Sequence, residues 1–155
     1  MKKISIMIPC FNEEENIVEI GNAVENEIKT NLPEYDYEIC YVDNASTDRT
    51  RELIEKKCAD NKKFKAIFNV TNFGQFNSPF HGICALDGDC IIPIVADFQD
   101  PVEMIPVFVR EWEKGHKIVS GVKGHICVFR ISTISWIIVA ITCIVRNRTP
   151  PKIRT

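Results

Sequence analysis

The sequence lacks both of the glycine-rich loops that most often hold phosphate groups in proteins. It contains no G-x-x-x-x-G-K-[ST] segment, and no G-x-G-x-x-G segment follows its first apolar run. In the first loop, backbone N–H groups surround nucleotide phosphates; in the second, glycines let the backbone approach a dinucleotide pyrophosphate. The sequence therefore disfavours a P-loop enzyme and a dinucleotide-dependent dehydrogenase.

The sequence also has no excess of positive charge. Its 155 residues include 19 Lys and Arg against 21 Asp and Glu, so the formal net charge is −2. A nucleic-acid binder must neutralise several phosphates, so we expect no nucleic-acid partner. With 45% hydrophobic and 26% charged residues, the chain has the composition of about one globular domain and shows no sign of disorder.

No C-x-x-C pair is present, and the three histidines are too scattered to form a metal site. Most of the seven cysteines lie inside apolar runs, where a reduced thiol packs as a small hydrophobic group. The N-terminus has no signal-peptide hydrophobic region of ordinary length. We therefore expect reduced, buried cysteines and a cytoplasmic location. The cysteines are Cys10, Cys40, Cys58, Cys84, Cys90, Cys127 and Cys143.

Apolar runs alternate with segments of helical periodicity along the chain. Strands are predicted at residues 4–9, 37–42, 64–68, 90–96 and 117–121. Helices are predicted from residue 13 to about 28, at 47–59, from 77 and at 101–114, with Asn12 and Ser46 as N-caps of the first two. This order predicts an α/β fold with an open, mostly parallel sheet and helices on both faces. Pro93 predicts a bulge or a local edge, because proline cannot donate to a sheet ladder.

Three polar clusters follow successive predicted strands: Asn12-Glu13, Asp43-Asn44 and Asp97-Phe98-Gln99. Ligands of open α/β sheets bind beyond the carboxyl ends of the strands, although each cluster alone is also compatible with a solvated turn. Asp100 to Glu103 reads as a helix-capping box with its proline, which explains Asp100. It leaves Asp97 and Gln99 as hard oxygen ligands, which suit Mg²⁺ or Mn²⁺ better than zinc or copper.

Four motifs, taken in order and spacing, resemble family 2 glycosyltransferases of the GT-A fold, a Rossmann-like α/β architecture. The resemblance is strongest to dolichol- or polyprenyl-phosphate sugar synthases and covers about the first 123 residues. The motifs are Ile8–Glu14, Val42–Asp48, Asn72–Gln75 and Ala96–Pro101.

The resemblance implies a hexosyl transfer from a UDP- or GDP-type sugar to a polyprenyl-phosphate or other cell-envelope acceptor. It implies a donor site in which Mg²⁺ or Mn²⁺, held by Asp97 and Gln99, bridges the two phosphates. It leaves the catalytic residue unassigned. The implied contacts to the nucleotide-sugar come from Pro9, Phe11, Glu13, Val42, Asp43, Asn44, Ala96 and Asp97.

The sequence departs from the family pattern at several positions. Asn44 and Val95 stand where aspartates are usual, and the carboxylate missing at Val95 implies a weaker metal or ribose site. Thr71 and Gln75 stand where basic residues are common.

Residues 124–155 match none of the family motifs, so we divide the chain into a donor-binding part, 1–123, and an atypical tail. The tail is apolar and then basic. It predicts an interfacial or packed helix over residues 126–145 at the inner face of the membrane, with a single-pass anchor as the alternative. A truncated or frame-shifted gene would also produce such a tail, which leaves an inactive nucleotide-binding remnant as an alternative function. A flavodoxin-like or receiver-type signalling module is a further alternative, because fold alone does not fix function.

Overall fold

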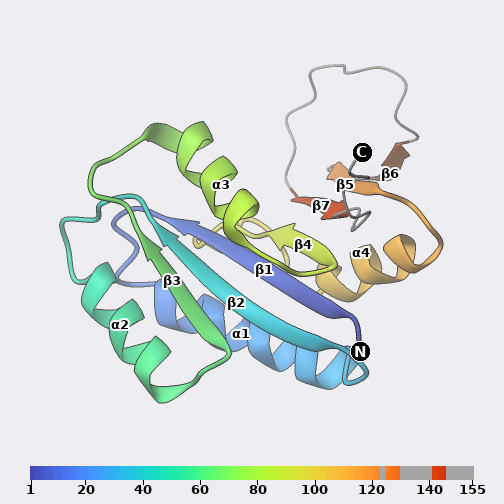
Figure 1. Cartoon of the computed structure of the whole chain (residues 1–155), viewed down its shortest axis with the longest axis horizontal. Coiled ribbons are helices and arrows are strands. Elements are labelled where there is room, and N and C mark those ends of the chain that lie inside the picture. Colours follow the sequence, from blue (N-terminus) through green and yellow to red (C-terminus); the bar gives the residue numbers. More distant parts are fainter. Residues whose placement is uncertain (123–124, 130–140, 146–155) are drawn as a thin grey trace, which may run out of the picture.

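The computed structural model describes residues 1–122, 125–129 and 141–145, along which strands and helices alternate (Figure 1). The predicted α/β class is confirmed. The helices are α1 (Ile17–Asn31), α2 (Thr50–Asp60), α3 (Gly74–Ala85) and α4 (Met104–Glu113). The strands are β1 (Lys3–Cys10), β2 (Asp36–Asp43), β3 (Phe64–Phe68), β4 (Cys90–Pro93), β5 (Ile118–Val122), β6 (His125–Phe129) and β7 (Ile141–Val145).

The described strands form one sheet in the order β3-β2-β1-β4-β7-β5-β6. β1 pairs in parallel with β2 on one side and with β4 on the other, and β2 pairs in parallel with β3. β7 joins β4 and β5 in antiparallel fashion, and β6 adds to β5 in the same way. Because the first four strands are parallel, their carboxyl ends meet at one edge of the sheet.

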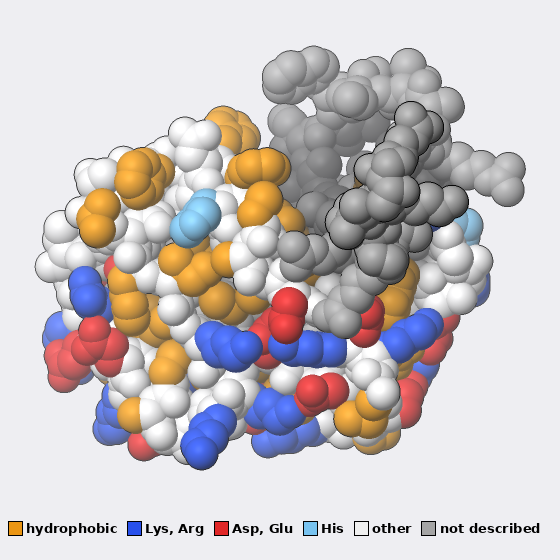
Figure 2. Space-filling view, viewed as in Figure 1, with side chains coloured by type: hydrophobic (Ala, Val, Ile, Leu, Met, Phe, Trp, Pro, Cys, Tyr) orange, Lys and Arg blue, Asp and Glu red, His pale blue; other side chains and the backbone are white. Residues whose placement is uncertain are grey.

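Helices cover both faces of the sheet, as predicted. Alternate residues of β1, such as Ile6 and Ile8, pack with buried side chains of α1, α2 and α4 in the larger core. Met7 points the other way and packs with Val42 and Ile83, the latter on α3. Figure 1 shows α3 alone above the parallel strands, with α1 and α2 below them. In Figure 2, charged side chains gather over the lower part of the molecule. β1 is thus buried on both faces, which explains its nearly continuous apolar run.

The predicted N-caps Asn12 and Ser46 are wrong. α1 begins at Ile17 and α2 at Thr50, and neither helix has a side-chain cap bond at its first turn. Asn12 instead adopts a positive φ of 56° and accepts a hydrogen bond from the backbone N–H of Thr47. Ser46 Oγ accepts a hydrogen bond from the backbone N–H of Asn12. Both side chains are therefore used between loops, which leaves none for a helix end.

The capping box at Asp100 is also not formed. α4 begins at Met104 without a side-chain cap bond, and Asp100 Oδ2 accepts a hydrogen bond from Val95 N–H at 3.2 Å. The carboxylate thus closes the loop after β4.

Two further boundaries differ from the sequence prediction. α3 begins at Gly74 instead of Asn77 and contains Pro79. β4 ends at Pro93 instead of Ala96.

Pro93 lies at a local edge, as one of the two predicted alternatives states. It pairs with Met7 of β1, and the next residue, Ile94, donates to Met7 O at 2.9 Å. On the other side, β7 pairs only with Cys90 and Ile91 of β4. The missing N–H of the proline therefore leaves no gap in the described ladder.

The predicted helix over residues 126–145 is wrong where the structure describes it. Residues 125–129 and 141–145 are the strands β6 and β7, and the intervening residues 130–140 lie outside the described part of the chain, as do 146–155. Both strands are rich in β-branched residues, which favour extended backbone. Among the described residues, no helix has the length and apolar character needed to cross a bilayer.

The cysteine prediction holds in part. Cys10, Cys40 and Cys90 are buried, whereas Cys58 is half-buried and Cys84 is exposed on α3. The side chains of Cys127 and Cys143 lie outside the described residues. Cys84 lies between the half-buried Ile83 and the buried Leu86 in an apolar segment, so local hydrophobicity did not show that its own side chain faces solvent.

Gly21 of α1 tests how closely this helix packs on the sheet. A Cβ at Gly21 would lie 1.9 Å from Tyr41 Oη, and Tyr41 is fully buried, so its ring cannot move away. We expect Gly21→Ala to lower the free energy of unfolding by about 1–3 kcal/mol in urea denaturation, despite the gain in helix propensity. Adding Tyr41→Phe removes the clashing hydroxyl, so the double variant should lose less than the sum of the single losses.

Asn26→Ala, on the exposed face of the same helix, is the matched control and should change stability by less than about 0.5 kcal/mol. A Gly21→Ala protein as stable as the wild type would contradict the close packing of α1.

Candidate functional site

The carboxyl ends of β1 and β2 are joined beyond the strands themselves. Asn44 N–H donates to Cys10 O at 2.9 Å, and Asn69 N–H donates to Asp43 O at 2.9 Å after β3. The loops that follow these three strands therefore begin at a common, rigid edge of the sheet. The predicted residues Phe11 and Glu13 follow β1 at this edge. The predicted residues Asp43 and Asn44 lie beside them at the end of β2.

The loops after β1 and β2 are bonded into one unit. Asn12 N–H donates to Ser46 Oγ at 2.9 Å, and Thr47 N–H donates to Asn12 Oδ1 at 2.8 Å. Next to this pair, Glu13 N–H donates to Thr50 Oγ1 at 2.8 Å. Asparagine tolerates the positive φ at position 12 better than most residues. These reciprocal bonds fix the backbone around Phe11 and Glu13.

Asp43 closes the loop after β2. Its side chain is 1% exposed, and its Oδ1 accepts hydrogen bonds from Ser46 N–H at 3.2 Å and from Ser46 Oγ at 2.5 Å. Ala45, inside this turn, has a positive φ of 64°, which is unfavourable for a residue with a Cβ. The carboxylate therefore holds a strained turn at the centre of the edge.

Asn44 connects this unit to the loop that precedes α3. Its Oδ1 accepts from Phe73 N–H at 2.9 Å and from Asn69 Nδ2 at 3.1 Å. Its Nδ2 donates to Asn72 Oδ1 at 2.8 Å. A carboxylate at position 44 would accept the first two bonds but could not donate the third. The asparagine that stands where an aspartate is usual thus matches its surroundings.

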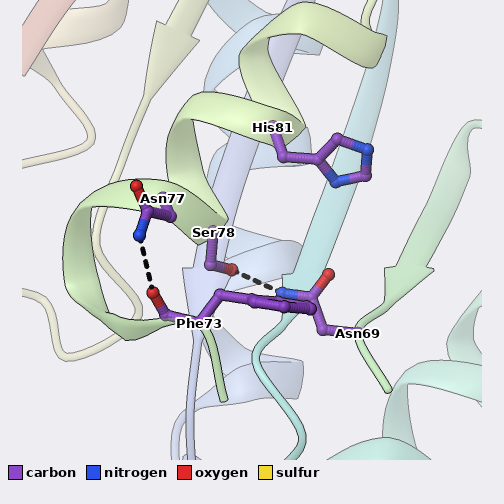
Figure 3. A pocket seen from close by; sticks show the side chains of 5 residues that line it. All are labelled: Asn69, Phe73, Asn77, Ser78 and His81. Atoms are coloured by element: carbon purple, nitrogen blue, oxygen red, sulfur yellow. Dashed lines mark hydrogen bonds between the residues drawn. The ribbon is translucent and has the colours of Figure 1, made fainter. Parts of the chain in front are cut away.

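A cavity of about 310 Å³ lies beside this loop, between the end of β3 and α3 (Figure 3). Asn69 Nδ2 donates to Ser78 Oγ at 2.8 Å, and Asn77 Nδ2 donates to Phe73 O at 3.2 Å. His81, one helical turn beyond Asn77, completes the lining. The sequence prediction gave none of these five residues a role in a site. The Asn72–Gln75 motif was the only signal near them.

Of the two aspartates in the loop after β4, only Asp97 is open to solvent. Asp97 is exposed and its Oδ1 accepts from Gln99 N–H at 3.2 Å, while Phe98 between them has a φ of 58°. Asp100 is 4% exposed, and burial raises its pKa, with a further rise from the negative charge of Asp97. Asp97 is therefore the aspartate of this loop that a ligand in solvent can reach.

Cys10, at the end of β1, is not a nucleophile. Burial raises the pKa of its thiol strongly, and the nearby carboxylates of Asp43 and Glu13 raise it further. The thiol stays protonated at neutral pH, and only the thiolate attacks efficiently.

The donor set at Asp97 fits a cation that arrives with a phosphate ligand. Among the described residues, no group of three or more His, Cys, Asp or Glu side chains is placed to hold a metal ion. Mg²⁺ and Mn²⁺ need no such group, because Mg²⁺ in particular is usually held by one or two carboxylates together with substrate phosphates and water. Asp97 offers one such carboxylate, and Gln99 adds an exposed amide next to it.

Residues 5–134 match the model of Glycosyl transferase family 2. The chain belongs to this family. The resemblance seen in the sequence motifs is thereby confirmed, and the residues of those motifs lie together at the carboxyl edge of the sheet.

Curated relatives in this family include transferases that act on lipid carriers. The chain is 36% identical over 123 residues to the undecaprenyl-phosphate 4-deoxy-4-formamido-L-arabinose transferase of Pseudomonas fluorescens, covering 79% of this chain and 36% of that protein. It is 34% identical over 117 residues to the prophage bactoprenol glucosyl transferase homolog of Escherichia coli, covering 76% and 38%. The chain thus spans little more than a third of each relative.

Solved structures share the fold at low sequence identity. The mannosyltransferase PcManGT of Pyrobaculum calidifontis, in complex with GDP-Man and Mn²⁺, has a TM-score of 0.62 at 18% identity, covering 77% of this chain and 35% of that one. S. aureus TarS in complex with UDP-GlcNAc has a TM-score of 0.56 at 23% identity, covering 81% and 36%. The GT-A fold predicted from the sequence is confirmed.

We expect Asn44→Asp to destabilise the protein at neutral pH, because two carboxylate oxygens would replace the amide and one would face Asn72 Oδ1 without a proton between them. The free energy of unfolding should fall by about 1–3 kcal/mol in urea denaturation. The deficit relative to wild type should shrink as the pH falls, since the carboxyl group introduced at this position can donate again once it is protonated.

Asn77→Asp is the matched control, because Asn77 is exposed and makes one long bond to Phe73 O. It should change stability by less than about 0.5 kcal/mol. Equal stability of Asn44→Asp and wild type at neutral pH would show that the amide does not hold the loop.

Proposed function

We propose that this chain binds a nucleoside-diphosphate sugar at the carboxyl edge of β1, β2 and β4, together with Mg²⁺ or Mn²⁺, and serves glycosyl transfer to a polyprenyl-phosphate acceptor. The observation that carries the proposal is the exposed Asp97 carboxylate, which follows β4 at the edge where two further polar loops are bonded into one unit. Open α/β sheets bind their ligands at such an edge.

Exposure divides the predicted donor-site residues into two groups. Phe11 is 44% exposed, Asp97 is also exposed, and the half-buried Glu13 carries a charged side chain, so we assign direct contact with the donor to these three. The other group is buried, apart from the half-buried Pro9, and sets the backbone position of the loops. Its members are Pro9, Val42, Asp43, Asn44 and Ala96.

The proposed roles follow from the chemistry of these side chains. The Phe11 ring offers a flat apolar surface for the nucleoside base, and Glu13 offers oxygens for its sugar hydroxyls. Asp97, with Gln99 beside it, would hold the cation together with the phosphates of the donor. When bound, the cation neutralises the negative charge that develops on the leaving nucleoside diphosphate as the glycosidic bond breaks. An oxygen of the acceptor phosphate forms the new bond to the anomeric carbon.

The relatives support a polyprenyl-phosphate acceptor, because their names include undecaprenyl phosphate and bactoprenol. The chain spans little more than a third of those proteins, so acceptor binding and turnover are part of the proposal. The fold neighbours, one with GDP-Man and Mn²⁺ and one with UDP-GlcNAc, support the donor and metal classes and leave the base open between uridine and guanosine.

Calorimetric binding of UDP, GDP and their sugars, with and without Mn²⁺, tests the donor site. We expect Mn²⁺-dependent binding to the wild type and at least a tenfold loss of affinity in Asp97→Ala, equivalent to about 1.4 kcal/mol or more. Asp60→Ala, an exposed carboxylate at the end of α2, is the control and should bind as the wild type does. Equal affinities of Asp97→Ala and wild type in Mn²⁺ would overturn the assignment.

Incubation of the same protein with a radiolabelled nucleotide-sugar and polyprenyl phosphate tests transfer separately. We expect the label to appear in the lipid product. Metal-dependent donor binding without any transfer would instead identify a nucleotide-binding protein that does not catalyse the reaction. Binding of flavin, or phosphorylation of Asp43, without nucleotide binding would favour a signalling module.

A further inference from the structure

One side of α3 and the loop before it expose large apolar side chains. Val70 is 93% exposed, Phe76 78% and Phe80 69%, and Phe73 is 47% exposed at the start of the helix. The three phenylalanines are spaced three and four residues apart, which places them on one side of a helix. We call these four residues the α3 aromatic face. A soluble surface rarely exposes so many neighbouring large apolar groups.

The segment that carries the α3 aromatic face has no formal charge. From Ala66 to Leu86 the sequence contains no Asp, Glu, Lys or Arg, the longest such run in a chain with 26% charged residues. Figure 2 shows hydrophobic side chains over the α3 part of the molecule, with most red and blue side chains below them. Burying this surface in a low-dielectric medium would therefore require no charged side chain of the segment to lose its water.

The cavity beside α3 adds depth to the same surface. Its volume is about 310 Å³, Phe73 belongs both to its lining and to the α3 aromatic face, and the polar groups of Asn69 and Ser78 in its wall bond to each other. Asn77 likewise bonds to the backbone of Phe73. Its walls are mainly carbon atoms, a lining that suits hydrocarbon.

The α3 aromatic face is attached to the carboxyl edge of the sheet. Asn44 bonds to Phe73 N–H and to Asn72, so the start of the helix is fixed to the loop after β2. The two other exposed phenylalanines of the described chain, Phe11 and Phe98, follow β1 and β4 at the same edge. Exposed aromatic rings thus follow β1, β3 and β4 at the edge of the sheet that carries the candidate donor site.

We propose that the α3 aromatic face docks on a phospholipid bilayer, with Phe76 and Phe80 inserted at the level of the acyl chains. Aromatic and aliphatic side chains drive the binding of interfacial helices through the apolar area that they bury. Because the segment has no cationic residue, this binding does not need anionic lipid. The proposal goes beyond the donor-binding function and does not depend on it, although a bilayer contact here would bring the donor site to a lipid-borne acceptor.

Co-sedimentation with vesicles of pure phosphatidylcholine tests the proposal on the full chain. We expect the wild type to bind, with no release when salt is raised to about 0.5 M, because screening weakens only charge interactions. Phe76→Ser/Phe80→Ser should partition at least about tenfold more weakly, since two buried rings are lost. Val18→Ser is the matched control, because Val18 is an exposed apolar residue of α1, on the opposite face of the sheet, and should leave binding unchanged.

A Phe76→Trp variant reports the contact itself. Its added fluorescence over the wild type should be quenched by vesicles that carry bromine on their acyl chains. We use thermal unfolding and Mn²⁺-dependent binding of UDP or GDP to show whether the double serine variant is folded. If the wild type fails to bind nucleotide, that result counts against the donor site and not against the bilayer contact.

Three results would overturn the proposal. The first is no binding of the wild type to phosphatidylcholine vesicles, including the case in which light scattering shows a dimer that the double variant loses. The second is equal binding of wild type and double variant. The third is binding that requires anionic lipid and is lost at high salt, which would point to basic residues such as Arg146 and Arg148.

Discussion

The central constraint in this structure is the parallel pairing of β1 with a neighbour on each side. The register places Cys10 opposite Asp43 and Met7 opposite Pro93, and backbone bonds continue past the strand ends from Asn44 to Cys10 and from Asn69 to Asp43. The loops that follow β1, β2 and β4, which have little regular structure, thus begin at fixed positions along one edge of the sheet. A change of register by one residue would reverse the burial of every side chain in the strand and would separate these loops.

Amide and hydroxyl side chains then hold the loops to one another. The Asn44 side chain both donates and accepts hydrogen bonds, which neither a carboxylate nor an ammonium group can do at neutral pH. The Asn12 side chain accepts from Thr47 N–H, while its backbone N–H donates to Ser46 Oγ. Among the described residues, no buried side-chain nitrogen or oxygen lacks a hydrogen-bond partner. The candidate site is therefore organised before a ligand arrives, with Asp97 left exposed at its margin. Preorganisation of this kind reduces the entropy lost on binding.

The sequence was sufficient for the parallel sheet and for the family, because both depend on strong local signals. Apolar runs buried on two faces mark the strands, and four polar motifs follow them in order. The helix starts were predicted wrongly, since Asn12, Ser46 and Asp100 are equally suited to cap a helix or to bond across a loop. Their partners decide between these uses, and Thr47 lies 35 residues from Asn12 in sequence. The cavity at His81 was missed because it exists only once α3 is placed beside the end of β3. The β-branched residues at 126–145 were read by length and hydrophobicity as a helix, although two segments there are strands.

The proposed function requires that a nucleoside diphosphate and a divalent cation bind together at the loop after β4. Paramagnetic broadening of backbone amide signals by Mn²⁺, in the presence of saturating nucleoside diphosphate, measures this directly. We expect the strongest broadening at Asp97, Phe98 and Gln99, with weaker effects around Phe11. Broadening centred on other carboxylates, such as Glu111 and Glu113 of α4, or broadening that is the same with and without the nucleotide, would contradict it.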